Sequence, residues 1–146
     1  MRMTIAEACR RMQRVVDGLD DAIDTILNNV EPDIVKMQTD RLQQGIFVSG
    51  NPIYPDYKPY TVAEKLRKEQ DAEHVTLRDT GAFYNAIYAA RIGDEVIIES
   101  GDEKNDELVE KYGEGIFGLT KEDKPDIKEK TTDGLVEYVK DITGFE

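Results

Sequence analysis

The first 30 residues carry apolar side chains in a helical pattern. From Ile5 to Ile26 they recur at alternating steps of three and four residues, which is the spacing of one face of an α-helix, and Val30 is among the residues that widen this face. Thr4 and Glu7 form a capping box at the start, since each can satisfy a free backbone amide near the other. Gly18 lies inside the pattern, and one glycine weakens a helix without ending it. The pattern therefore predicts one long amphipathic helix.

Pro32 leaves two interpretations of the next segment open. Proline lacks an N–H donor and clashes with the preceding turn, yet it is well tolerated at the first position of a helix. The chain therefore either kinks at Pro32 or starts a second helix there, which runs to about Gln44 and ends at Gly45. Residues 45–60 contain three prolines and two glycines, which predicts an irregular loop rich in tyrosine.

The pattern changes to alternation after residue 85. A short helix over about 62–70 is expected first, capped by Thr61 and Glu64, and then a helical turn around 81–84 capped by Asp79 or Thr80. Residues 86–92 and 95–100 favour strands, and the two residues between them suit a tight hairpin turn. A helix that runs on through residue 90 is the competing interpretation.

Two helices and a strand are predicted in the last third of the chain. A helix over about 107–112 ends at Gly113, an extended strand lies near 115–119, and a final helix begins at the capping motif Thr120–Asp123 and ends at Gly144. The predicted fold class is α+β, with long N-terminal and C-terminal helices packed on a small antiparallel sheet made of the 86–100 hairpin and the 115–119 strand. We expect one domain over 1–146: an N-terminal helical arm (1–44), a Tyr/Pro-rich loop (45–60) and an α+β part (61–146).

The negative net charge of the chain argues against some classes of binding partner. The chain has 31 acidic and 19 basic residues and a net charge of −12, whereas tight binding to phosphate backbones needs clustered lysine and arginine. The segment Lys65, Arg67 and Lys68 is offset by neighbouring carboxylates. No apolar run reaches the length of a membrane span. We therefore expect no specific nucleic-acid site and no membrane partner.

The usual chemical signatures are missing from the sequence. Cys9 and His74 are the only residues of their kinds, so neither a disulfide nor a Cys/His zinc cluster is expected. A serine triad would need His74 with Ser49 or Ser100, and neither serine lies in an elbow motif. The acidic segment 101–107 lacks the spacing of a calcium loop. The sequence therefore predicts no catalytic residue, no cofactor and no metal, and a protein that is not an enzyme.

Two short motifs, taken with the order of the predicted elements, carry a resemblance. Leu77-Arg-Asp-Thr-Gly81 precedes the hairpin, and Ile116-Phe-Gly-Leu-Thr120 leads into the final helix. Over about residues 61–142 the chain resembles the phage virion-morphogenesis and tail-completion proteins, which form head–tail connectors or necks. That family carries Leu-Arg-x-Thr-Gly before a hairpin and a Pro-Ala-Arg-x-Phe-Leu-Gly-Leu-like segment before its last helix. Here Gly113-Glu-Gly115 replaces the Pro-Ala-Arg portion.

The resemblance implies a structural virion protein, of a kind expected in crAss-like or other Bacteroides phages. It would be made in the host cytoplasm and form a homo-oligomeric ring in the neck or upper tail, against portal, neck or tail proteins. The residues that it would use fall into three groups. The structural motif comprises Leu77, Arg78, Asp79, Thr80, Gly81, Gly115, Ile116, Phe117, Gly118 and Leu119. The candidate subunit or partner contacts are Tyr54, Tyr57, Tyr60, Tyr88 and Ile97. The lumen through which DNA passes would be lined by Glu95, Glu99, Asp102 and Glu103.

Two other functions stay open. An acidic interaction or inhibitor module that mimics nucleic acid would use the same charge, and a small hydrolase would depend on His74. For the three tyrosines of the 45–60 loop, packing within the chain is the alternative to a partner contact, because tyrosine buries a large area at low entropic cost.

Overall fold

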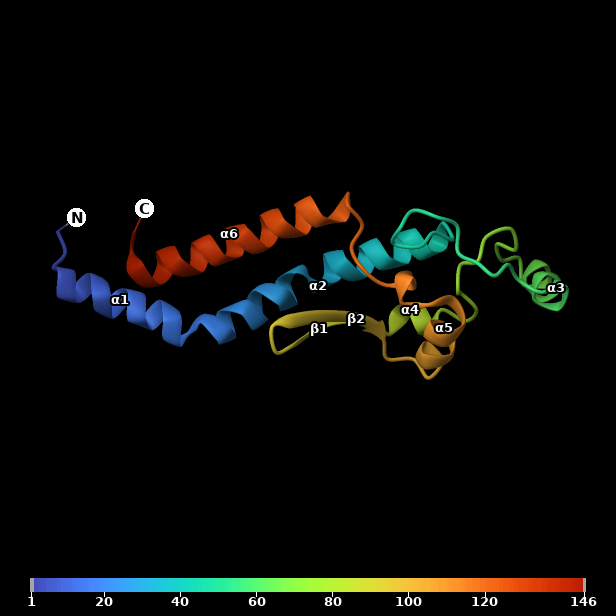
Figure 1. Ribbon diagram of the computed structural model, residues 1–146, viewed down its shortest axis with the longest axis horizontal. Coiled ribbons are helices and arrows are strands. Elements are labelled where there is room, and N and C mark those ends of the chain that lie inside the picture. The colour runs from blue at the N-terminus through green and yellow to red at the C-terminus, as the bar shows by residue number, and fades with distance from the viewer. Residues whose placement is uncertain (1, 146) are drawn as a thin grey trace.

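The chain folds into an elongated α+β structure. The computed structural model describes residues 2–145, with six α-helices, a short 3₁₀-helix and one two-stranded antiparallel sheet in that range. The elements are α1 (Ile5–Asp17), α2 (Leu19–Gln43), α3 (Pro59–Arg67), α4 (Ala82–Asn85), β1 (Ile87–Ile92), β2 (Glu95–Ser100), α5 (Asn105–Tyr112), η1 (Glu114–Ile116) and α6 (Asp123–Thr143). Both termini lie at the α1 end, and α3 lies at the other end (Figure 1). The predicted fold class and its hairpin are confirmed.

The N-terminal helix is broken at Gly18, so the prediction that this glycine does not end the helix is wrong. Thr4 caps α1 as expected, since its hydroxyl accepts from the Glu7 N–H at 3.1 Å. At the break, Tyr138 of α6 reaches in and donates its hydroxyl to the Val15 carbonyl at 2.8 Å. A Cβ at position 18 would lie 2.6 Å from that hydroxyl oxygen. Only glycine therefore leaves room for this contact.

Pro32 neither ends α2 nor separates two helices. The helix runs from Leu19 to Gln43 with Pro32 inside it. Val30 and Ile34, on either side of the proline, are both buried against the hairpin and α6. Tertiary packing of that face offsets the hydrogen bond that proline removes.

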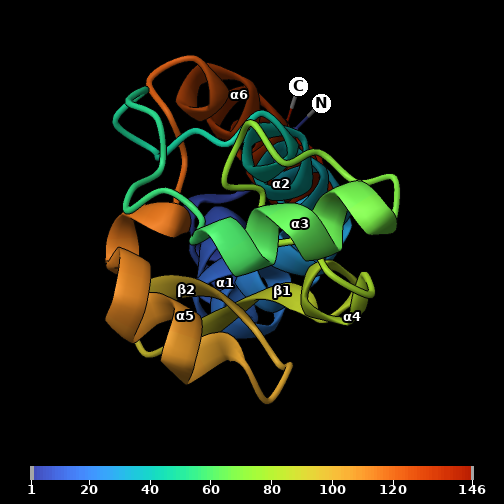
Figure 2. The ribbon, with the colours of Figure 1, turned by 90° about the vertical axis from the view of Figure 1, so that its right-hand side faces the viewer.

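The hairpin packs on α2 through one face. Ile87 pairs with Ser100, Ala89 with Ile98 and Arg91 with Val96 on that face. Ala89 joins the cluster with Val30 and Ile34, and Ile127 of α6 packs against the same cluster. Near the turn, Arg91 donates to the Asp20 carboxylate at 2.9 Å and to Asp24 at 3.3 Å. Seen along the molecule, α2 lies between α6 and the hairpin (Figure 2).

The predicted strand near 115–119 is absent from the sheet, and that prediction is wrong. Glu114–Ile116 forms the 3₁₀-helix η1, and the backbone is extended at Phe117 without pairing to another strand. The backbone groups here bond instead to side chains of α2: Gln38 binds both the N–H and the carbonyl of Gly118. Gly118 has φ of 138°, a conformation that interrupts a regular strand.

The loop and the helix after it are also bounded differently from the prediction. Helix α3 begins at Pro59 and not near residue 62, with Lys58 before it, because proline at the first position is pre-organised for a helix. The Thr61–Glu64 pair thus lies inside the helix. At α6, by contrast, Thr120 and Asp123 cap each other as predicted, each accepting the other's N–H at 3.1 Å.

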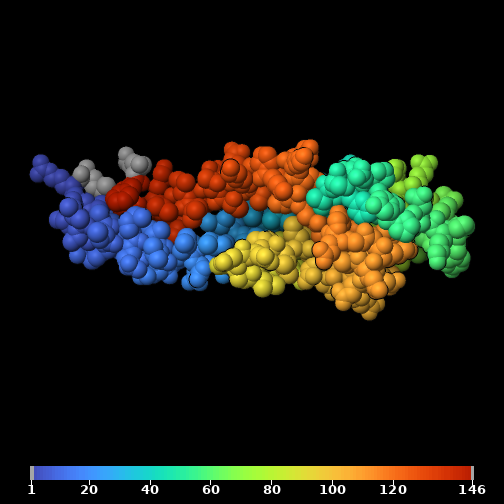
Figure 3. All heavy atoms as spheres, viewed as in Figure 1, coloured from blue at the N-terminus to red at the C-terminus, as the bar shows by residue number. Residues whose placement is uncertain are grey.

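The buried core is confined to one part of the molecule. Its main cluster joins Leu42 of α2 to Ile116 of η1, both fully buried, with Phe83, Tyr84 and Tyr112 around them. By contrast, α1 and α6 bury one residue each, Val15 and Thr143. We call residues 2–17 and 123–145 the two-helix arm and residues 18–122 the central region. Beyond the hairpin, α1 and the C-terminal part of α6 lie side by side at one end of the molecule (Figure 3).

Candidate functional site

The motif Leu77–Gly81 begins in a strained conformation that its neighbours hold in place. Leu77 has φ of 58°, which is costly for a bulky residue, and its side chain is buried in the main core. The Tyr57 hydroxyl accepts from the N–H groups of Thr76 and Leu77 at 3.0 and 3.1 Å. Tyr84 donates its hydroxyl to the Thr76 carbonyl, and burial raises the pKa of that phenol.

The polar groups of the same motif bind to α3 and to the start of α4. Lys65 of α3, itself buried, donates its Nζ to the Arg78 carbonyl. Lys68 donates to the Asp79 carboxylate at 2.6 Å, and this hydrogen bond is the main reason that the pKa of Asp79 lies below its usual value. The Thr80 hydroxyl accepts from the Ala82 N–H at 3.2 Å, at the start of α4. The motif thus uses its polar groups to shape the backbone.

A cleft of about 670 Å³ lies between this motif, α3 and α5. Its walls combine aromatic rings, among them Tyr57, Tyr60 and Phe83, with charges of both signs. The charged residues are Glu64, Lys65, Lys68, Arg78, Asp79, Asp102, Glu103, Lys104 and Glu107. Among the lining residues there is no serine, cysteine or histidine, so the walls hold no serine–histidine or cysteine–histidine pair.

The remaining chemical candidates lie outside the cleft. His74 Nδ1 lies 2.8 Å from the Asp71 carboxylate on the surface. Ser100 donates to the Phe83 carbonyl, and the Ser49 hydroxyl accepts from Asn51. Cys9 is exposed on α1. Within residues 2–145 no group of three or more His, Cys, Asp or Glu residues is placed to hold a metal, and no helix is both long and apolar enough to cross a bilayer.

The second motif, Gly115–Leu119, is held against α2 by a buried polar network. Arg41 donates to the carbonyls of Ile46, Ile116 and Gly118, and also to the side-chain oxygen of Gln38. Burial lowers the pKa of this guanidinium, which nevertheless remains a cation. Neither Gln38 nor Arg41 was identified from the sequence as part of the motif's surroundings. The sequence does contain a signal for this network: Arg41 lies three residues after Gln38, so both polar side chains fall on the same inner face of a helix.

The two motifs meet in the same core. The rings of Phe83, two residues after the first motif, and Phe117, in the second, have centroids 5.8 Å apart. Gly118 approaches Val48 so closely that a Cβ there would lie 3.1 Å from the valine side chain. Sequence segments more than 30 residues apart therefore form one structural unit.

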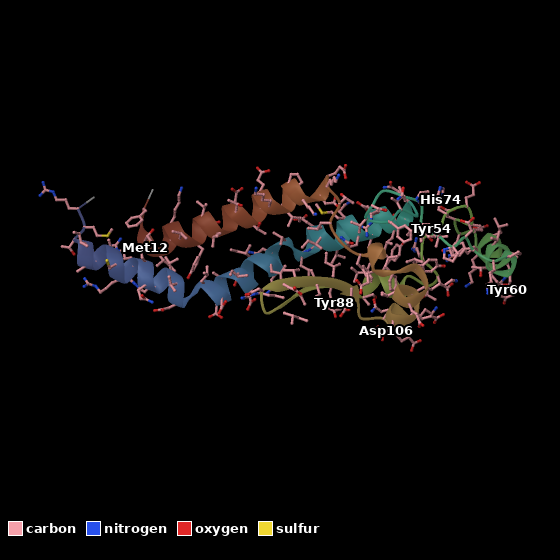
Figure 4. All side chains as sticks on the ribbon, in the orientation of Figure 1. Met12, Tyr54, Tyr60, His74, Tyr88 and Asp106 are labelled. Atoms are coloured by element: carbon pink, nitrogen blue, oxygen red, sulfur yellow. The ribbon has the colours of Figure 1, made fainter. Side chains whose placement is uncertain are left out.

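The tyrosines proposed as contacts have different environments. Tyr57 is bound inside the chain, as described above, whereas Tyr54 and Tyr60 are 68% and 78% exposed. Tyr54 packs edge-on against Phe47 at 5.3 Å. Tyr60, in the first turn of α3, lies at the end of the molecule opposite Met12 (Figure 4). The loop is therefore attached to the chain through Tyr57, and Tyr54 and Tyr60 remain mostly exposed.

The four acidic residues proposed for a lumen lie on two surfaces. Glu95 and Glu99 share the outer face of the hairpin with Tyr88 and Ile97, and Tyr88 donates its hydroxyl to Glu99. That hydrogen bond raises the pKa of Tyr88. Asp102 and Glu103 line the cleft beside α5. One channel wall that holds all four would have to run from the hairpin to the start of α5.

Comparison with known proteins returns no match: no family model, no curated protein and no solved structure matches this chain. The inference of function therefore rests on the residues and contacts of this chain.

Proposed function

We propose that this chain is a structural virion protein of a tailed phage, which forms a homo-oligomeric ring at the head–tail connector, neck or upper tail. The resemblance of Leu77–Gly81 and Ile116–Thr120 to the tail-completion motifs supports this assignment. The contacts of both motifs are structural, since their polar groups bind backbone and neighbouring lysines. A ring protein needs such motifs for shape and no active site.

The observation that carries the proposal is the exposed apolar surface of the two-helix arm. Ile5 is 85% exposed and Val16 63% exposed, although both belong to the predicted apolar face of an amphipathic helix. Helices in soluble proteins bury such a face against another element. A ring supplies that element from the neighbouring copy, through a repeated contact between subunits.

The acidic balance of the chain fits the same proposal. A ring through which DNA passes benefits from a wall that does not bind phosphate, and Glu95 and Glu99 are candidates for that wall. The portal and other neck or tail proteins are the proposed partners. A ring whose channel wall is basic or neutral would remove the lumen from the proposal and leave the ring itself.

The test is the assembly state of the full chain. The mass in solution is measured by light scattering and native mass spectrometry, and the sample is then mixed with a portal protein and a tail-tube protein. We expect closed multimers that bind one of these proteins. A stable monomer that binds a nuclease and never enters particles would overturn the ring and favour the acidic inhibitor. A hydrolytic activity lost in His74→Ala would favour an enzyme.

A further inference from the structure

The two helices of the arm are antiparallel and meet along a seam marked by Val15 and Tyr138. Tyr138 donates to the Val15 carbonyl at 2.8 Å, and Arg11 donates to the Thr143 carbonyl at 2.6 Å one turn further out. Gly18 lies against the same tyrosine. These contacts fix which side of each helix faces the other, so that the remaining sides can be located from helical periodicity.

Both helices turn apolar residues to the same side of the seam. Met12 and Val16 lie about 60° and 100° round α1 from Val15, at 100° per residue. Leu135 and Val139 lie about 60° and 100° round α6 from Tyr138 by the same count. Because the helices are antiparallel, equal rotations of the same sign bring both pairs to one side of the arm. Ile5 and Cys9 continue the stripe on α1, with the steps of four, three and four residues that helix–helix seams use.

This side of the arm is open in the single chain, and we call it the apolar arm face. On α1, Met12 is 44% exposed, and on α6, Leu135 is 39% exposed. The opposite side of the arm is charged, with Arg14 on α1 and Glu137 on α6 each about 100° from the seam in the other direction. A pair of helices with one apolar and one charged side is half of a helix bundle.

The charges of the arm indicate what covers this face. Residues 2–17 hold four arginines and two carboxylates, a net charge of +2, and residues 123–145 hold four lysines and six carboxylates, a net charge of −2. The arm is therefore neutral, and the excess of carboxylates that gives the chain its −12 lies outside it. Two copies of an acidic protein repel each other over most of their surfaces, but two neutral arms do not. Placing α1 of one copy over α6 of the next also opposes +2 to −2.

We propose that the apolar arm face binds a second copy of this chain, with α1 of one copy packed antiparallel on α6 of the next. This deepens the proposed function and rests on it in one respect, that the chain assembles with itself. The helices of neighbouring arms form one bundle around the shared axis, in which Met12 and Val16 of one copy contact Leu135 and Val139 of the next. The contact buries the stripe that no described element of the same chain covers.

Cross-linking in the full chain tests the register. In a Cys9→Ala background, Val16→Cys and Val139→Cys are combined in one chain, because rotation about an axis along the arm brings these positions together between copies. Mild oxidation is expected to give covalent multimers on a non-reducing gel. The matched control, Arg14→Cys with Glu137→Cys on the charged side, is expected to stay monomeric on the same gel.

Three outcomes of the cross-linking would overturn the proposal. The first is a monomer band alone from the Val16→Cys/Val139→Cys chain. The second is equal cross-linking in the charged-side control. The third is a covalent dimer from Val16→Cys by itself, which would show α1 packed on α1 and not on α6.

Weakened association provides a second measurement that does not depend on disulfide geometry. Val16→Glu is expected to weaken self-association at least tenfold in sedimentation experiments, whereas Asn28→Glu, at an exposed position of α2 outside the arm, leaves it unchanged. Circular dichroism checks that both variants keep their helices. Cross-links without ring formation or particle binding would refute the proposed function alone, and rings without these cross-links would refute this contact alone.

Discussion

The central region and the two-helix arm bury their apolar residues to very different extents. In the central region, Leu42 and Ile116 are fully buried, and the buried polar groups of Gln38 and Arg41 bind backbone around them. In the arm, Val15 and Thr143 are the buried residues of two helices that together span more than 30 positions. The central region thus contains its own core, whereas the arm leaves apolar side chains exposed to solvent. Stability differs along one chain when contact density differs.

The largest expected effect is the loss of stability when a buried isoleucine of the central region, and not an exposed one of the arm, is shortened to alanine. Ile116→Ala removes a fully buried side chain and should lower the free energy of unfolding by about 2–5 kcal/mol. Ile5→Ala, the same change at an 85% exposed position in the arm, should stay within about 0.5 kcal/mol in the dilute monomer. Urea unfolding followed by circular dichroism measures both. Equal losses would contradict the division into a packed region and an open arm.

An intermediate effect is expected at the break between α1 and α2. Alanine in place of glycine normally favours a helix by about 1 kcal/mol. At Gly18, however, the new Cβ would lie 2.6 Å from the Tyr138 hydroxyl oxygen, so Gly18→Ala should destabilise the arm by about 1 kcal/mol through overpacking. Hydrogen exchange in α1 and in the C-terminal half of α6 should accelerate, while exchange in the central region stays unchanged.

The double variant Gly18→Ala/Tyr138→Phe is the control for that prediction. It removes the oxygen that the new methyl group would meet and should recover most of the lost protection, although the hydrogen bond to the Val15 carbonyl is also lost. A gain in stability from Gly18→Ala alone would show that Tyr138 does not occupy this position in solution.

The smallest effect concerns an exposed ion pair of the central region. The pKa of Asp79 is lowered, chiefly by the hydrogen bond from Lys68 and then by its charge and that of Lys104. A lowered folded pKa stabilises the protein above the unfolded value, near pH 4, and this contribution disappears as the pH falls through the folded value. Asp79→Asn should therefore reduce stability slightly at pH 7 and hardly at pH 3.

Salt screening and solvent exposure keep that difference small. An NMR titration of the Asp79 carboxyl group checks the direction of the shift, and urea unfolding at both pH values checks the stability. Asp133→Asn, on the exposed side of α6, is the matched change in the arm. A midpoint for Asp79 at or above the ordinary value would contradict the pairing with Lys68.

The sequence alone was sufficient for elements whose causes are local. Thr4 with Glu7 and Thr120 with Asp123 are capping pairs whose partners lie three residues apart, and both are present. The hairpin over residues 87–100 follows from alternating side chains and a two-residue turn. Propensity, capping and periodicity act within a few residues, so they can be read without knowledge of the fold.

The tertiary structure alone decided everything that depends on distant partners. Gly18 ends a helix because Tyr138, 120 positions away, occupies the space of its side chain. Residues 115–119 form no strand because Gln38 and Arg41 of α2 take the backbone groups that a neighbouring strand would need. The open face of the arm likewise follows from how α6 lies on α1. A helical pattern predicts that an apolar face exists, but burial depends on what packs against it in three dimensions.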